Sequence, residues 1–175
     1  MRMKTWTKNN QNGFTAMELL IAILVFLIVA AVSTPFMLGA IQDYRLRGAA
    51  WQVVGDLRLA RQKSVASGRK YRLWFHHNGA ASDRNSYKIQ RLLGVDWTTG
   101  PTEDDPSHPI YLQQPGSPTY VMIDSTTSTP ADGKIYFSAT GTVSNYGTMI
   151  LVDSRGKRYD VIINSVGRVR VVKQF

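Results

Sequence analysis

The sequence predicts an α+β fold, in which a long N-terminal helix with a membrane-spanning first half packs against a C-terminal head of antiparallel β-sheet. Three patterns carry this prediction. Residues 19–41 form an apolar block without a charged residue. Residues 43–68 repeat apolar side chains at spacings of three and four, which is the period of an amphipathic helix. From residue 71 onward the period shortens to two, as in strands with one buried face.

Length and composition allow one globular head. The chain has 175 residues, so about 100 to 120 remain for a head once the apolar block is set aside. It contains no cysteine, which excludes a disulfide framework and a thiolate metal site. The formal net charge is +9, and this surplus favours a polyanionic partner.

The apolar block is long enough to cross a membrane, because a helix of about 20 residues covers a hydrocarbon core of about 30 Å. The charged residues of the stretch before residue 14 are all bases, namely Arg2, Lys4 and Lys8. The positive-inside rule therefore keeps residues 1–13 in the cytoplasm and places everything after Ile41 on the outer face. The sequence predicts a single-pass inner-membrane protein with a periplasmic head.

Glu18 distinguishes this segment from simpler membrane segments. A secretory signal would end in a small-residue cleavage site on the far side, and a plain anchor would contain no acid. A carboxylate at this depth costs roughly 2.5 to 3.5 kcal/mol on insertion scales. The sequence therefore predicts a partner charge for Glu18.

The stretch GFTAMELLI at residues 13–21, followed by Pro35, resembles the processing signal and first helix of type IV prepilins and pseudopilins. The resemblance implies that a membrane-embedded prepilin peptidase cuts after Gly13 and that Phe14 becomes an N-methylated N-terminus. It also implies that Glu18 pairs with the terminal amine of a neighbouring subunit. One departure is the pair at residues 16–17, Ala-Met, where a branched aliphatic pair is more usual.

Further consequences follow from this resemblance. Pro35 stands where the family places a helix-bending proline, and its missing backbone donor weakens the helix locally. Loss of the three leader bases lowers the formal charge from +9 to +6. The expected organisation is a leader at 1–13, a membrane and assembly half of the helix at 14–41, an amphipathic half at 42–68 and a β-rich head at 69–175.

The amphipathic half predicts one buried stripe and one helix end. The stripe comprises Leu46, Ala50, Val53, Leu57, Ala60 and Ser64. Gly68 is expected to end the helix. A hairpin should follow, with strands near 71–75 and 86–92, and then an irregular stretch over 94–118 with at most a short strand near 110–112. Later strands are predicted at 120–123, 134–137, 148–152, 158–163 and 168–172.

The head carries a second resemblance, to the GspH/FimT group of minor pilins and pseudopilins. The residues that carry it are LRLARQ at 57–62, a strand after Gly68-Arg69, Ile135-Tyr136-Phe137 with Gly141 four residues on, and the ending Gly167-Arg168-Val169-Arg170. Together with the leader, this resemblance spans nearly the whole chain and implies the pilin fold.

No catalytic constellation is found in the sequence. It contains neither a Gly-x-Ser-x-Gly elbow nor a glycine-rich phosphate loop. His76 and His77 are interpreted as solvated turn residues, because no helical His pair accompanies them. Glu103, Asp104 and Asp105 lack the ligand spacing of a calcium loop and are interpreted as a solvated acidic turn. We expect no enzymatic activity, no cofactor and no metal site.

The C-terminal segment is the sharpest candidate site. From residue 147 onward six bases face two acids, the bases being Arg155, Lys157, Arg158, Arg168, Arg170 and Lys173. Residues two apart share a face of a sheet, so Arg168 and Arg170 should lie about 7 Å apart and match successive phosphates. A Gly-Arg-x-Arg ending is associated with DNA binding in FimT-like minor pilins of naturally competent bacteria, which implies the same role for Gly167, Arg168 and Arg170. The alternative is the solvated face of an edge strand.

Two classes of function follow. One is a structural minor pilin that helps to initiate or cap a type IV pilus, with a GspH-like minor pseudopilin of a type II secretion system as the alternative. The other is a pilus subunit that captures double-stranded DNA for natural transformation. The expected partners are other pilin or pseudopilin subunits, the prepilin peptidase, the inner membrane and, in the second class, DNA.

Overall fold

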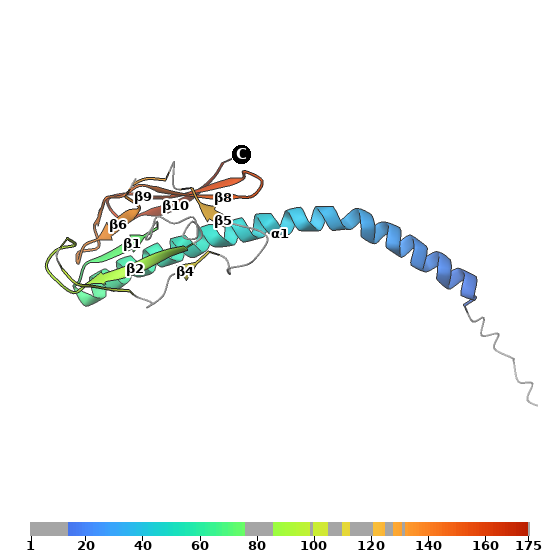
Figure 1. Ribbon diagram of the computed structural model, residues 1–175, viewed down its shortest axis with the longest axis horizontal. Helices are drawn as coiled ribbons and strands as arrows, with labels where there is room; N and C mark the ends of the chain where they lie inside the picture. The colour runs from blue at the N-terminus through green and yellow to red at the C-terminus, as the bar shows by residue number, and fades with distance from the viewer. Residues whose placement is uncertain are drawn as a thin grey trace, which may run out of the picture. The chain divides into compact units, whose positions relative to one another are not determined.

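The computed structural model describes residues 14–75, 86–98, 100–104, 110–112, 121–124, 128–130 and 132–174 (Figure 1). The leader at 1–13 with Gly13 lies outside these residues. So do the predicted turn residues His76 and His77, together with Asp105 and Tyr120. The chain divides into two compact units between Ala40 and Ile41.

Helix α1 spans Ala16–Ser67, 52 residues, and contains Pro35. Within the described residues it is the one helix long and apolar enough, by length and composition, to cross a membrane. Its apolar side chains before Pro35 are exposed. The hydroxyls of Ser33 and Thr34 each donate to the carbonyl four residues back, at 2.8 Å in both cases. This bonding satisfies the two polar side chains of the apolar block inside the helix itself.

The second half of α1 buries the predicted stripe. Leu46, Ala50, Val53, Leu57, Ala60 and Ser64 are each no more than 1% exposed, which confirms the prediction. The helix ends at Ser67 because Gly68 adopts φ +63°, a left-handed conformation that favours glycine.

The head contains two antiparallel sheets where the sequence predicted antiparallel sheet without its division. The first has the order β3-β2-β1-β6-β7, with β4 also paired to β2. Its strands are β1 Tyr71–Trp74, β2 Ser86–Leu92, β3 Thr102–Asp104, β4 Ile110–Tyr111, β6 Lys134–Phe137 and β7 Val143–Ser144. The second has the order β10-β9-β8-β5. Its strands are β5 Val121–Ile123, β8 Thr148–Asp153, β9 Arg158–Ile163 and β10 Val169–Gln174.

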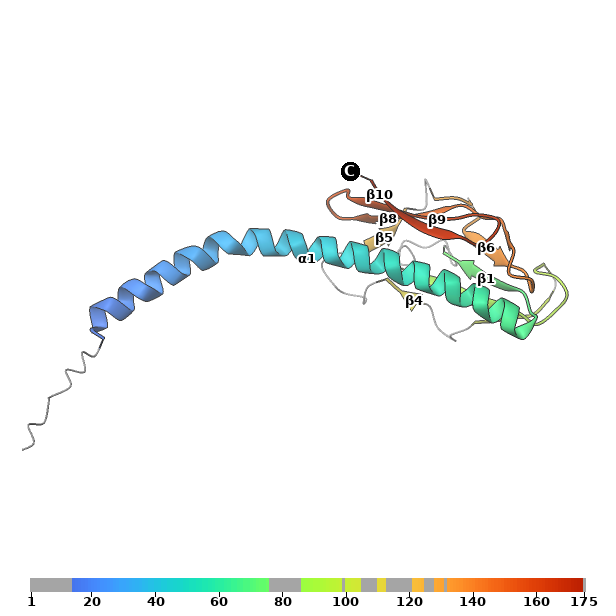
Figure 2. The same ribbon diagram turned by 180° about the vertical axis from the view of Figure 1, so that it is seen from behind.

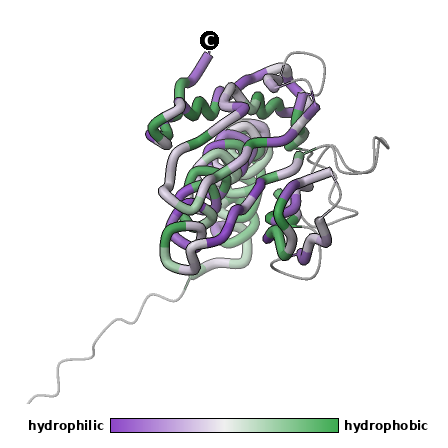
Figure 3. Tube along the Cα trace, turned by 90° about the vertical axis from the view of Figure 1, so that its left-hand side faces the viewer, coloured by the Kyte–Doolittle hydropathy of each residue, from purple (hydrophilic) through white to green (hydrophobic). Residues whose placement is uncertain are grey.

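Both sheets and the second half of α1 share one hydrophobic core. Members from the first sheet include Leu73, Ile89 and Phe137, and members from the second include Met149, Leu151 and Val161. In Figures 1 and 2 both sheets lie along the second half of the helix. Figure 3 shows hydrophobic and hydrophilic residues interspersed through the head. In β8 the consecutive residues Met149, Ile150 and Leu151 are all buried, so neither face of this strand is left to solvent.

The structure corrects the interpretation of the acidic stretch. Glu103 and Asp104 were predicted to form a solvated turn, but they lie in β3 beside β2. Asp104 pairs with Lys88 at 3.0 Å, and Glu103 pairs with Arg91. The prediction was wrong because these acids pair with bases on the neighbouring strand, and local sequence does not show such pairing. Strand β7 was also missed, since two residues are too few for a periodic signal.

Candidate functional site

The start of α1 forms a capping box. The Glu18 amide donates to Thr15 Oγ1 at 3.2 Å, and Glu18 Oε2 accepts from the Thr15 amide at 3.4 Å. The two side chains thereby satisfy two backbone donors at the helix start. Sequence reasoning missed Thr15, although the spacing Thr-x-x-Glu before an apolar run is the usual signal of this box.

Glu18 lies in apolar surroundings within the first unit. Its neighbours in a hollow of about 500 Å³ are Phe14, Leu19, Ala22, Ile23 and Phe26. Glu18 is therefore the one ionisable residue among the residues that line this hollow. In the single chain, the carboxylate has the Thr15 amide as its partner.

The basic C-terminal segment separates into two ends of β9. At the β8–β9 turn, the Arg155 guanidinium donates to Asp153 Oδ2 at 2.7 Å and also to Asp43 of α1. Lys157 Nζ lies 2.7 Å from Asp43 Oδ2. The hydrogen bonds from Lys157 and then Arg155 hold the pKa of Asp43 below its usual value. This end of the segment is thus neutralised locally.

The next base along the chain is also paired. Arg158 Nε lies 2.6 Å from Asp160 Oδ1, and its second nitrogen donates to Oδ2 at 3.1 Å. Gln174 of β10 donates to the same carboxylate at 3.1 Å. The hydrogen bond with Asp160 raises the pKa of Arg158. Asp160 is 5% exposed, so the pair is built into the sheet surface.

At the other end of β9, a tight turn presents Arg168 and Arg170. Asn164 Oδ1 accepts from the Arg168 amide at 2.8 Å, and the Asn164 carbonyl accepts from Gly167 at 2.9 Å. Arg168 stands one residue before β10, whereas the prediction placed it inside the strand. Both arginines line a hollow of about 340 Å³ with Ile162 and Asn164. Both are exposed, and within the described part of the chain neither guanidinium has an ion-pair partner.

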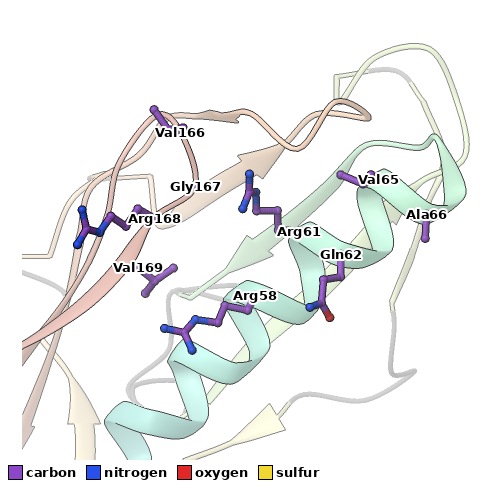
Figure 4. A pocket seen from close by; sticks show the side chains of 9 residues that line it. All are labelled: Arg58, Arg61, Gln62, Val65, Ala66, Val166, Gly167, Arg168 and Val169. Carbon is purple, nitrogen blue, oxygen red and sulfur yellow. The ribbon is translucent and has the colours of Figure 1, made fainter.

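Gly167 connects this turn to the helix. It adopts φ +80°, and a Cβ at this position would lie 2.7 Å from Arg61 Nε. That Nε donates to the Gly141 carbonyl at 2.9 Å, so the arginine stem is held in place. Figure 4 shows Arg61 reaching from α1 toward the turn that carries Gly167 and Arg168. Glycine is required here both for its backbone conformation and for the space that Arg61 occupies.

Two family models match the chain. The model described as "Type II transport protein GspH" matches residues 49–167, which is more than half of the chain. The chain belongs to the GspH family. A model of the prokaryotic N-terminal methylation motif matches residues 8–34. No curated protein and no solved structure matches the chain significantly.

Membership of the GspH family defines the broad role of the chain. Together with the methylation motif, it makes this protein a membrane-anchored, pilin-like minor subunit of type IV pili or type II secretion. Such a subunit assembles with other pilin or pseudopilin subunits after processing by the prepilin peptidase. The family is structural and not enzymatic. Among the described residues, no group of three or more His, Cys, Asp or Glu side chains could hold a metal ion.

The GspH-family head does not gather all the predicted basic residues into one cluster. Arg155, Lys157 and Arg158 lie at one end of β9, while Arg168 and Arg170 lie at the other. Lys173 pairs with Tyr159 across β10 and β9, three residues from Arg170 and thus on the opposite face. Arg61 and Gly167 belong to separate sequence motifs, and no local signal relates residues so far apart.

Proposed function

We propose that this GspH-family protein is a non-enzymatic minor subunit of a type IV pilus and that its C-terminal hairpin binds duplex DNA. The observation that carries the DNA-binding role is the contrast between the two ends of β9. Arg155, Lys157 and Arg158 are neutralised by carboxylates, whereas Arg168 and Arg170 are exposed without an acid beside them. Two adjacent guanidinium groups suit the phosphates of a nucleic-acid backbone.

Processing and assembly involve the N-terminal part of the chain. The peptidase removes residues 1–13, Phe14 is N-methylated, and the chain crosses the inner membrane once with its head in the periplasm. In the filament, the Phe14 amine of one subunit faces Glu18 of another, and each charge offsets the desolvation of its partner. The intact mass of the membrane-extracted protein tests the processing step. A mass that retains the leader in a strain with active prepilin peptidase would contradict it.

Glu18→Gln tests the assembly contact more sharply than Glu18→Ala. A glutamine keeps the acceptor for the Thr15 amide and hence the capping box, but it removes the charge. If the charge is needed, both variants fold, and both are depleted from the sheared filament fraction. If only the cap matters, Glu18→Gln assembles like the wild type, and the proposed ion pair is wrong.

DNA binding is tested with the full processed chain in non-ionic detergent. Fluorescence anisotropy with a labelled duplex measures the affinity of the wild type and of the double variant Arg168→Ala, Arg170→Ala. The matched control, Arg47→Ala with Arg69→Ala, removes two exposed charges outside the hairpin. We expect a large loss of affinity in the double variant Arg168→Ala, Arg170→Ala and little loss of affinity in the control. Equal losses would indicate diffuse attraction, and no binding by the wild type at low salt would refute the DNA-binding role.

A second candidate function is a minor pseudopilin of a type II secretion system. It is favoured by the description of the matching family and by the end of that match at Gly167, before both arginines. Deletion of the gene separates the candidates. For a DNA-binding pilus subunit, we expect loss of DNA uptake with normal protein secretion. For a pseudopilin, we expect loss of protein secretion with normal DNA uptake.

A further inference from the structure

Arg168 borders two hollows. The smaller, about 340 Å³, lies on β9 and β10 and includes Arg170. The larger, about 880 Å³, lies between the 164–168 turn and α1 and includes Arg58 and Arg61 (Figure 4). Arg168 is the one residue common to both linings, so the two hollows adjoin at this side chain, and we call their joint lining the basic surface.

The charge of this surface has one sign. The linings of the two hollows contain the guanidinium groups of Arg58, Arg61, Arg168 and Arg170 and no carboxylate. Four like charges around adjoining hollows raise the local potential and attract an anion. An extended run of cations suits a polymer with one charge on each unit better than it suits a single carboxylate.

Arg58 is the helix residue that is available for such a ligand. It precedes Arg61 by three residues, a spacing that places both side chains on one face of the helix. Arg61 uses its Nε for the Gly141 carbonyl, whereas Arg58 is exposed and has no ion-pair partner among the described residues. In Figure 4 the guanidinium groups of Arg58 and Arg168 extend toward the same end of the hollow.

We infer that the DNA-binding surface extends from the hairpin across the turn onto α1, and that Arg58 contacts a backbone phosphate. This inference rests on the proposed function and adds a residue far from the C-terminal motif. Arg61 is a positioning residue, which holds the turn so that Arg168 stands between the two hollows.

The test is the salt dependence of duplex binding by the full chain in non-ionic detergent. Each phosphate contact contributes about 0.9 to the slope of log affinity against log salt, so three contacts give about −2.7. Raising salt from about 50 to about 200 mM then weakens binding about 40-fold, and about 12-fold when one contact is lost. Arg58→Ala should show the smaller slope, and Arg58→Lys should restore most of the wild-type slope.

Arg47→Ala is the matched control, since it removes one exposed arginine from the same helix about 16 Å away at helical rise. A wild-type slope in this control and a reduced slope in Arg58→Ala support the inference. If Arg58→Ala binds like the wild type while Arg168→Ala, Arg170→Ala does not, the hairpin alone is the site and the inference is overturned. If Arg58→Ala keeps DNA binding but is depleted from filaments, the larger hollow takes a protein partner, which also overturns it.

Discussion

The two ends of β9 carry similar numbers of bases but differ in whether carboxylates pair with them. At the β8–β9 end, Asp43, Asp153 and Asp160 accept hydrogen bonds from every base of the turn and of the strand start. At the β9–β10 end, Arg168 and Arg170 have no carboxylate among the residues that line their hollow. A local surplus of charge in a sequence therefore says little about which charges a partner can reach.

The two ends also differ in what maintains their shape. Carboxylates organise the first turn, since Asp153 accepts from the amides of both Arg155 and Lys157 at 2.9 Å. The second turn depends on Asn164, on a glycine with positive φ and on the Arg61 stem beneath it. The bases of the first turn form ion pairs within the head, whereas Arg168 and Arg170 form none among the described residues.

The largest loss of stability is expected when the glycines of the two turns are replaced. Gly156 has φ +79° with open space around a Cβ, whereas Gly167 has φ +80° and Arg61 Nε at 2.7 Å. Gly156→Ala should therefore cost about 1 to 2 kcal/mol from the left-handed backbone alone. Gly167→Ala should cost about 1 kcal/mol more, because Arg61 must give up its hydrogen bond to Gly141. Chemical denaturation followed by circular dichroism measures both.

The extra cost at Gly167 should disappear in an Arg61→Ala background. The smaller side chain leaves room for the new Cβ, while the backbone strain remains. Equal costs for the two glycines in the wild-type background would mean that Arg61 does not brace the turn.

The substitution Asp160→Asn should release Arg158 from its ion pair. Stability of the head should fall by about 1 to 2 kcal/mol, since the charged hydrogen bonds with Arg158 are weakened. Affinity for duplex DNA should rise severalfold, because one negative charge is lost and Arg158 is released. Denaturation and anisotropy on the same sample test this. A fall in affinity would show that Asp160 supports the binding surface.

The acid contact at Asp43 predicts a pH effect of definite sign. Its folded pKa lies below the ordinary 3.8, so its contribution is present above pH 3.8 and is lost as pH falls through the lower, folded value. The wild type should therefore have a higher melting temperature than the Asp43→Asn variant at neutral pH. This difference in melting temperature should disappear in acid. Melting curves of both proteins across this range check it. A difference that persists in strong acid would assign the effect to packing.

The smallest effect on stability is expected at the β9–β10 end. Arg168→Ala with Arg170→Ala should change the free energy of unfolding by no more than about 0.5 kcal/mol, because the side chains are exposed and unpaired. The same variant should lose DNA binding. A stability loss well above this value would mean that these arginines maintain the fold, and the contrast between the two ends would fail.

The helix and most strands could be predicted from sequence because their signals are local. The stripe from Leu46 to Ser64 follows helical spacing, and Gly68 ends the helix in the expected place. Strand β3 could not be predicted from local sequence, because it is stabilised by the pairing of Glu103 and Asp104 with bases on β2. The boundary of β10 was wrong by one residue at Arg168, where Asn164 sets the turn.

The sequence by itself determined the apolar helix, the N-terminal methylation motif at residues 8–34 and the β-rich head, since each depends on residues close together in the chain. Tertiary structure alone decided which bases remain available. Asp43 reaches Arg155 across 112 residues, and Arg61 reaches the carbonyl of Gly141 across 80. Hydrogen bonds and ion pairs act over a few ångströms, and only the folded chain brings such distant residues within that range.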